Sequence, residues 1–184
     1  METYISILRG INVGGKNKIK MNDLKELYEE LKFKNIITYI QSGNIIFNSN
    51  QKAADQNIAK QIEKGISKKF NLDVAAVIRT INELKNIIKI NPFLTMPGID
   101  IEKLHVTFLE KVPGQIELDN TKKHDYTPDK FIIAGREVFL YCPGGYGKSK
   151  LSNNFFENKL KVKATTRNWK TVNKLVELAE GIAK

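Results

Sequence analysis

A segment rich in glycine and lysine near the N-terminus has the residue types of an anion-binding loop. It reads LRGINVGGKNKIK over residues 8–20, and it leaves a predicted strand to enter a predicted helix. Such a loop exposes main-chain N–H groups, and the dipole of the following helix adds positive potential. The glycines lack the GxGxxG spacing of a dinucleotide site. The alternative is a surface turn with solvated lysines. The phosphate-binding candidates here are Arg9, Asn12, Lys16 and Lys18.

A second glycine-rich segment, YCPGGYGKSK over residues 141–150, has the order of strand, loop, Gly-Lys-Ser and helix that is typical of a P-loop. The P-loop pattern requires glycine where Cys142 stands, and the preceding strand is predicted to be half of a hairpin. These departures argue against nucleotide hydrolysis and leave a looser anion-binding loop or a plain glycine turn. The candidates in this segment are Tyr146, Lys148, Ser149 and Lys150.

The segment TTRNW, residues 165–169, is predicted to begin the last helix, with Thr166 as its cap. Arg167 and Asn168 would then stand in a first turn, where the helix dipole favours acids. An anionic partner would remove this conflict, so both residues are binding candidates. Trp169 lies on the apolar stripe of the helix and is predicted to be core; the alternative is base stacking.

The hairpin turn Gln41-Ser42-Gly43-Asn44 carries two side-chain amides. The amides of Gln41 and Asn44 have the donors and acceptors needed to contact a base or a sugar, which makes both residues binding candidates. The alternative is turn chemistry alone, because Asn and Gly are typical turn residues.

Catalytic residues are not identified by the sequence. His105 is predicted on a strand face and His124 in a polar loop, and the two share no metal-ligand spacing with each other or with Cys142. We therefore expect no metal and no cofactor, and whether the chain is an enzyme stays open. The acids nearest the basic loops are Asp23 and Glu157, and a solvated helix face explains both.

The net charge of +10 over 184 residues comes from two short segments. Residues 9–20 carry +4 and residues 145–174 carry +7, so the rest of the chain is nearly neutral. Clustered basic charge is typical of proteins with phosphate-bearing partners. An AT-rich coding sequence would also raise the lysine content, but it would not cluster the charge. Only four basic residues are arginine, and two of these, Arg9 and Arg167, lie in the charged segments.

The composition is that of an ordinary globular protein, with 41% hydrophobic and 27% charged residues. No apolar run approaches the roughly 20 residues of a membrane span, so we expect no membrane association. The N-terminus lacks the basic and small-residue regions of a signal peptide. A single cysteine favours a reducing compartment, and the expected location is the cytoplasm.

Apolar periodicity predicts an α+β fold in which the ferredoxin-like βαββαβ plait occurs twice, each with a mostly antiparallel sheet and helices on one face. The first copy contains strands at residues 3–8, 36–41, 44–48 and 74–79, with helices capped by Asn22 and Asp55. A capping box of Thr80 and Glu83 begins a short linking helix. The second copy contains strands at residues 104–110, 130–134, 136–141 and 162–164 and a helix at 150–160. A polar stretch, residues 113–128, stands where its first helix is needed. We place the boundary between subdomains 1–92 and 93–184.

Four motifs in this order, LRGINVGGKNKI, TYIQSGNIIF, YCPGGYGKSKLSNNFFENKL and ATTRNWKTVNKL, resemble the bacterial domain of unknown function family 1697. The resemblance runs from Tyr4 to about Ala179. It implies two ferredoxin-like subdomains and no activity, and it identifies no catalytic residue. Arginine stands in some family sequences where this chain has Lys148, which favours a generic cation at that position.

Three functions are compatible with these features. The first is binding of a phosphate-bearing ligand, with nucleic acid slightly preferred to a nucleotide. The second is an enzyme acting on a small phosphorylated or nucleotide substrate in a cleft between the subdomains. The third is a protein-interaction module whose charge reflects codon usage; its protein partners are unknown.

Overall fold

The computed structural model describes residues 1–51, 55–121 and 125–183, so His124 lies outside the described residues. The chain divides into two compact units, Met1–Asn86 with Lys174–Lys184, and Ile87–Asn173. Each unit contains one four-stranded sheet. The boundary at residues 92 and 93 stays a prediction from the sequence.

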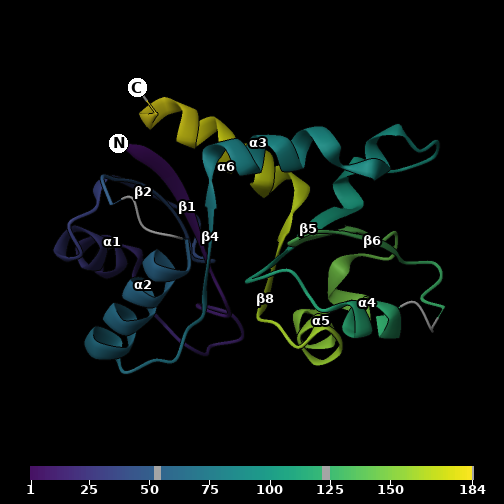
Figure 1. Cartoon of the computed structure of the whole chain (residues 1–184), viewed down its shortest axis with the longest axis horizontal. Coiled ribbons are helices and arrows are strands. Elements are labelled where there is room, and N and C mark those ends of the chain that lie inside the picture. Colours follow the sequence, from purple (N-terminus) through teal and green to yellow (C-terminus); the bar gives the residue numbers. More distant parts are fainter. Residues whose placement is uncertain (52–54, 122–124, 184) are drawn as a thin grey trace. The chain divides into compact units, whose positions relative to one another are not determined.

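The first unit is a βαββαβ plait (Figure 1). Its elements are β1 (Glu2–Leu8), α1 (Met21–Glu30), β2 (Lys34–Tyr39), β3 (Asn44–Ser49), α2 (Asp55–Phe70) and β4 (Ala76–Thr80). The strand order is β2-β3-β1-β4, and every neighbouring pair is antiparallel. Helices α1 and α2 lie side by side against one face of this sheet (Figure 1). The predicted element order of the first half is confirmed.

The core between this sheet and its two helices contains a cluster of aromatic rings. Phe47 of β3 has no exposed surface, and its ring centroid lies 4.4 Å from Phe33, 5.4 Å from Tyr28 and 5.8 Å from Tyr4. The Tyr28 hydroxyl donates a hydrogen bond to Ser6 Oγ at 2.8 Å, so this buried polar group is satisfied. The cluster fixes α1 against the sheet and thereby fixes the N-terminus of α1.

The second unit repeats the plait with β5 (Leu104–Leu109), α4 (Gln115–Thr121), β6 (Lys130–Ala134), β7 (Glu137–Tyr141), α5 (Asn153–Leu160) and β8 (Ala164–Asn168). The strand order β6-β7-β5-β8 corresponds position by position to that of the first sheet. Helix α4 occupies part of the stretch that the sequence predicted only as polar. It supplies the missing first helix of the plait, and it packs with α5 (Figure 1).

A helix follows the last strand of each plait directly, as α3 (Ile81–Ile90) and α6 (Trp169–Ile182). At the first junction Thr80 Oγ1 accepts from the Glu83 N–H, and a Glu83 carboxylate oxygen accepts from the Thr80 N–H at 2.8 Å, which confirms the predicted capping box. At the second junction Asn168 Oδ1 accepts from the Thr171 N–H at 2.7 Å. Trp169 is buried, as predicted for the apolar stripe.

Two predicted helix caps are wrong. The residue that precedes α1 is Lys20, not Asn22, and its side chain makes no capping hydrogen bond. Thr166 does not cap α6, because residues 164–168 form strand β8, which is longer than the predicted strand at 162–164. Arg167 and Asn168 therefore precede the helix, and the predicted conflict with its dipole does not arise.

Three short 3-10 helices complete the described chain: η1 (Pro92–Thr95), η2 (Ile101–Lys103) and η3 (Tyr146–Lys148). None of the helices in the described ranges combines the length and apolar character needed to cross a bilayer.

Candidate functional site

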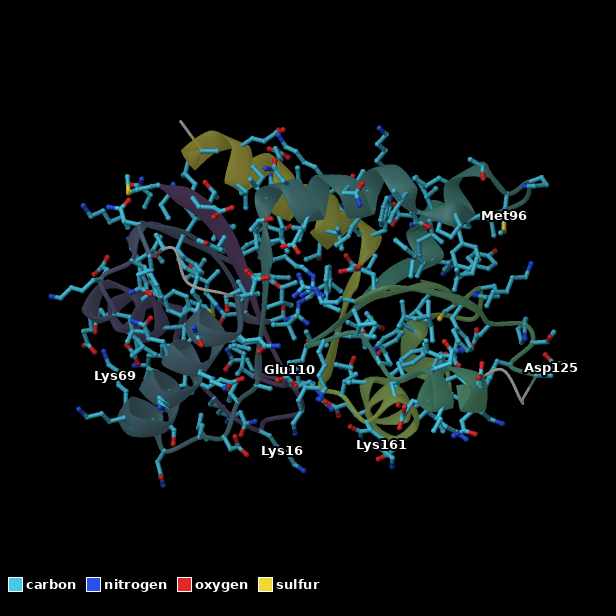
Figure 2. All side chains as sticks on the ribbon, viewed as in Figure 1. Lys16, Lys69, Met96, Glu110, Asp125 and Lys161 are labelled. Carbon is cyan, nitrogen blue, oxygen red and sulfur yellow. The ribbon has the colours of Figure 1, made fainter. Side chains whose placement is uncertain are left out.

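The glycine-rich loop after β1 folds back on itself as a small hairpin. The Asn12 N–H donates to the Asn17 carbonyl, and the Lys16 N–H donates to the Val13 carbonyl, each at 3.1 Å. Gly14 and Gly15 form the tip with positive φ, and a Cβ at either position would contact nothing within 4 Å. Lys16 stands at the end of this hairpin (Figure 2). The loop is therefore a defined structure that carries lysines.

Asn12 holds the loop against the rest of the first unit. Its Nδ2 donates to the carbonyls of Ile19 and Gln41, and its Oδ1 accepts from the Ile19 N–H, all at 2.9 Å. The contact with Gln41 joins the loop to the turn between β2 and β3. Asn12 therefore has a positioning role in the candidate site, because both ends of its amide are occupied by main-chain groups.

A hollow of about 640 Å³ lies beside this loop, and we call it the loop hollow. It is lined by Asn12, Gly15, Lys18, Ile19, Lys20, Asp23, Gln41 and Phe70. Three of the candidates identified from the sequence, Asn12, Lys18 and Gln41, thus meet at one surface. Phe70, the last residue of α2, joins them through tertiary packing, and no motif marked it in the sequence.

The loop hollow combines two lysines with one carboxylate. Among the described residues, no hydrogen bond or ion pair engages the side-chain ends of Lys18, Lys20 or Gln41. Lys20 is the N-cap residue of α1, and its side chain makes no capping hydrogen bond, so no cap from this residue occupies the first N–H groups of the helix. Asp23, in the first turn of α1, is half-buried at the same hollow.

Lys69 on α2, labelled in Figure 2, pairs with two glutamates of α1. Its Nζ lies 2.7 Å from Glu30 Oε1 and 3.7 Å from Glu26 Oε2. The hydrogen bond to Glu30 raises the pKa of Lys69, so this lysine is committed to its acidic partners. The available cationic charge at the loop hollow is therefore that of Lys18 and Lys20.

Three other candidates of the first unit, Arg9, Lys16 and Asn44, do not line the loop hollow. Arg9 is half-buried, and its main-chain N–H donates to the Ala75 carbonyl at 2.8 Å. Asn44 is completely buried, and its Nδ2 donates to the Tyr39 carbonyl and to Ser42 Oγ. The amide of Asn44 thus closes the hairpin turn, which is the structural alternative considered from the sequence.

The second glycine-rich segment does not have the geometry of a P-loop. The strand before it, β7, is half of the hairpin with β6, as predicted. The short helix η3 follows the glycines, and the next α-helix begins only at Asn153, capped by Ser152. Ser149 Oγ donates to Asp129 Oδ2 at 2.6 Å, which places a carboxylate where a P-loop serine meets a metal and phosphate.

Lys148 and Lys150 are exposed on either side of Ser149. Cys142 is buried below this segment, and burial raises the pKa of its thiol to about 11. A thiol with a raised pKa is a poor nucleophile at neutral pH. Within residues 1–51, 55–121 and 125–183, no three histidine, cysteine or acidic side chains gather as a set of metal ligands.

Tyr146 of η3 is held in a polar cluster on the second sheet. Its ring stacks on His105 with centroids 4.9 Å apart, and its hydroxyl donates to Thr166 Oγ1 at 3.0 Å. Thr166 in turn donates to Asn153 Oδ1 at 2.6 Å and shares a hydrogen bond with Thr107. This network occupies the Tyr146 hydroxyl and fixes the glycine-rich segment to the sheet.

His105 is expected to make the stability of the protein depend on pH. Burial lowers the pKa of its imidazole below the ordinary value of 6.5, so the folded state favours the neutral ring. The unfolded chain binds the proton more readily, and stability should therefore fall as the pH drops below 6.5. Denaturant titrations between pH 5 and 8 test this effect. His105→Gln should flatten the profile in that range, and an unchanged slope in the variant would contradict the assignment.

Arg167 occupies the same position in the second plait that Arg79 occupies in the first. Each lies one residue before the residue that caps the following helix, and Nη1 of each donates to the carbonyl of the preceding residue at 2.8 Å. Arg167 Nη1 also donates to Thr165 Oγ1 at 3.0 Å. Asn168 caps α6. The structure thus gives both candidates of the third motif local roles in a strand–helix junction.

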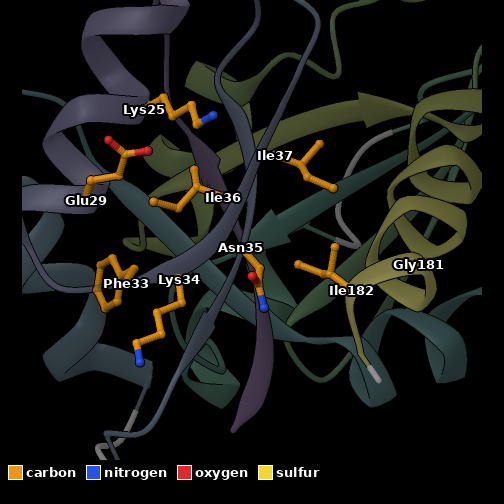
Figure 3. A pocket seen from close by; sticks show the side chains of 9 residues that line it. All are labelled: Lys25, Glu29, Phe33, Lys34, Asn35, Ile36, Ile37, Gly181 and Ile182. Atoms are coloured by element: carbon orange, nitrogen blue, oxygen red, sulfur yellow. The ribbon is translucent and has the colours of Figure 1, made fainter.

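A second hollow, of about 760 Å³, lies at the outer edge of the first sheet and contains none of the candidates from the sequence. We call it the edge hollow; its lining consists of Lys25, Glu29, Phe33, Lys34, Asn35, Ile36, Ile37, Gly181 and Ile182. Figure 3 shows β2 between α1 on one side and the end of α6 on the other. The register of β2 with β3 shifts between Lys34 and Ile37, and Asn35 has a φ of 50°.

Comparisons with known proteins identify a family and a fold. The family model described as "Protein of unknown function (DUF1697)" matches residues 1–139. The match includes the loop hollow and ends before the second glycine-rich segment. The solved structure of a conserved bacterial protein from Streptococcus pneumoniae is similar with a TM-score of 0.69 and 21% identity, over 97% of this chain and 98% of that one. Among curated proteins no significant sequence match was found. At this identity the structural similarity establishes the fold alone.

Proposed function

The chain belongs to the DUF1697 family of proteins of unknown function, and we propose that it binds a phosphate-bearing ligand, a nucleic acid or a nucleotide, at the loop hollow. One observation carries this proposal: in the described part of the chain, the ammonium groups of Lys18 and Lys20 have no anionic partner although both line one hollow. Ammonium groups that a protein leaves unpaired beside a concave surface favour an anionic ligand.

Main-chain N–H groups add to the attraction that Lys18 and Lys20 exert on an anionic ligand. Helix α1 begins at Met21, directly after its N-cap residue Lys20, whose side chain makes no capping hydrogen bond. The first N–H groups of α1 and the helix dipole stabilise negative charge at the same hollow. The Gln41 side chain, also unengaged among the described residues, supplies a further donor. Asn12 fixes the geometry by holding the loop against Ile19 and Gln41.

Replacement of the two lysines should weaken binding of phosphate-bearing probes about tenfold or more, which corresponds to about 1.4 kcal/mol or more. The variant is Lys18→Gln/Lys20→Gln, and the probes are pyrophosphate, AMP and a single-stranded RNA of ten residues, titrated calorimetrically at low and physiological salt. For the RNA the slope of log K against log salt should also become shallower, by about 0.7 for each lost phosphate contact.

The matched control is Lys60→Gln/Lys64→Gln, because both lysines are exposed on α2 outside the loop hollow and the change in net charge is the same. It should retain most of the wild-type affinity. Equal losses in the two double variants would mean that binding follows net charge alone, and the proposed site would be rejected. Absence of binding by the wild-type chain to all three probes would reject the proposed function itself.

A further inference from the structure

The loop hollow contains a carboxylate that a site for phosphate alone would not need. Asp23 lines the hollow together with Lys18 and Lys20 and is half-buried there. In the part of the chain that the structure describes, no hydrogen bond or ion pair within 4 Å occupies this carboxylate, although its charge also acts on Lys69 of α2. A carboxylate repels a phosphate, so it weakens a site built only for an anion. It suits a ligand that also carries hydroxyl or amino donors.

An aromatic ring lines the same hollow. Phe70 ends α2, packs against the core of the first unit and lines the loop hollow beside Ile19, which is buried. Aromatic side chains at polar sites bind the flat faces of nucleobases by stacking, with little dependence on the base. The hollow thus offers a flat apolar surface, a carboxylate and two ammonium groups.

The dimensions and the open wall of the hollow suit one nucleotide unit. A volume of about 640 Å³ falls within the range of roughly 300 to 1,000 Å³ that small-molecule sites span. Gly15 forms part of the wall with no heavy atom within 4 Å of the position a Cβ would take, so a ligand can approach its main chain. Gln41 adds an amide that can both donate and accept.

We propose that the loop hollow recognises a nucleoside phosphate unit, with Lys18 and Lys20 on the phosphate, Asp23 on hydroxyl or amino donors of the nucleoside and Phe70 against the base. This inference rests on the proposed function, because it assigns Asp23 and Phe70 of the same site to the nucleoside part of the ligand. The unit is either a free nucleotide or one residue of a nucleic acid strand, since both present the same groups.

The test compares AMP with pyrophosphate, because pyrophosphate provides the charge without the nucleoside. Calorimetric titration of the whole chain should give an affinity for AMP at least tenfold higher than for pyrophosphate. Asp23→Asn should weaken AMP binding about fivefold or more and should leave pyrophosphate binding equal or tighter, because a repelling charge is removed. Phe70→Leu should weaken AMP binding at least about fivefold and leave pyrophosphate binding unchanged.

Glu29→Gln is the matched control for Asp23→Asn, because Glu29 is an acid of the same helix that lines the edge hollow instead. It should alter neither affinity. Asp23→Asn adds no apolar surface and should therefore leave the fold intact. The test thus remains decisive even if Phe70→Leu lowers the stability of the protein. An oligoadenylate of five residues separates the two sources of the unit: a much higher affinity than that of AMP identifies a strand, and an equal affinity identifies the free nucleotide.

The outcomes separate this inference from the proposed function. Pyrophosphate that binds as tightly as AMP, with Asp23→Asn affecting both alike, overturns the nucleoside assignment and leaves phosphate binding in place. Failure of every phosphate-bearing probe to bind overturns both proposals. The opposite effects of Asp23→Asn on AMP and on pyrophosphate would support the inference directly.

Discussion

Replacing Gly43 with alanine is expected to lower the free energy of unfolding by about 2 to 5 kcal/mol. A Cβ at this position would lie 2.7 Å from two side-chain atoms of Ile11 and 2.9 Å from Leu8 Cβ. The backbone φ of +75° adds strain for any residue with a side chain. Gly43 also accepts a hydrogen bond from the Leu8 N–H at 2.8 Å, so the turn cannot move away freely.

Gly135→Ala separates the two causes of this loss. Gly135, in the turn between β6 and β7, has a φ of +62°, and a Cβ there would contact nothing within 4 Å. The strain at positive φ alone is worth about 1 to 2 kcal/mol. Denaturant titrations of both variants should therefore show a clearly larger loss for Gly43→Ala. Equal losses would mean that close packing against Ile11 contributes nothing. Because Ile11 belongs to the glycine-rich loop, Gly43→Ala should also weaken ligand binding at the loop hollow.

Truncation of Phe47 to alanine is expected to cost about 3 to 5 kcal/mol of stability. The side chain is completely buried, and rings of Tyr4, Tyr28 and Phe33 surround it at centroid distances of 4.4 to 5.8 Å. Removal of the ring loses its transfer free energy and leaves a cavity that rigid aromatic neighbours fill poorly. The measurement is the midpoint of denaturant unfolding with its slope, compared with that of the wild-type chain.

Phe47→Leu provides the graded comparison for this prediction. Leucine retains most of the apolar volume, so the loss should be roughly half of that for alanine or less. Tyr4→Phe removes only a hydroxyl that donates to Glu2 at 2.9 Å, and it should have a small effect. If Phe47→Leu and Phe47→Ala were equally destabilising, ring contacts and not cavity formation would dominate the energetics of this core.

Strong periodicity made most of the fold predictable. The apolar positions of α1 and α2 and the β-rich runs of both hairpins are distinct enough to give the βαββαβ order of the first unit. Helix α4 was not predicted because its seven residues, QIELDNT, bury only Thr121 and show no apolar stripe. Short helices of this kind owe their formation to tertiary contacts, and α4 packs with α5.

The end of β8 differs from the sequence prediction because two local signals compete there. Thr165 and Thr166 are β-branched and favour a strand, while threonine is also a good helix cap. Pairing with β5 over five residues stabilises the strand conformation of residues 164–168. Asn168 then caps α6 by accepting a hydrogen bond from the Thr171 N–H. Pairing between strands that lie this far apart in the sequence depends on tertiary structure and has no local sequence marker.

The candidate site was predictable in part. The side-chain chemistry of Asn12, Lys18 and Gln41 identifies them as candidates in the sequence, and they line one hollow. Asp23 has the sequence context of any acid in a first helical turn, and Phe70 that of any core residue at the end of an apolar stripe. Their position at the loop hollow depends on how α1 and α2 pack on the sheet, which residue spacing does not specify.

The interrupted register of β2 has a consequence for aggregation. A regular outer strand presents a row of unpaired N–H and C=O groups, which is a template for edge-to-edge growth of sheets. The left-handed backbone of Asn35 and the register shift between Lys34 and Ile37 break this row near its start. Lys34 adds a charge beside the break, which further disfavours a second strand. The first plait therefore carries its own protection against fibril-like stacking of its exposed edge.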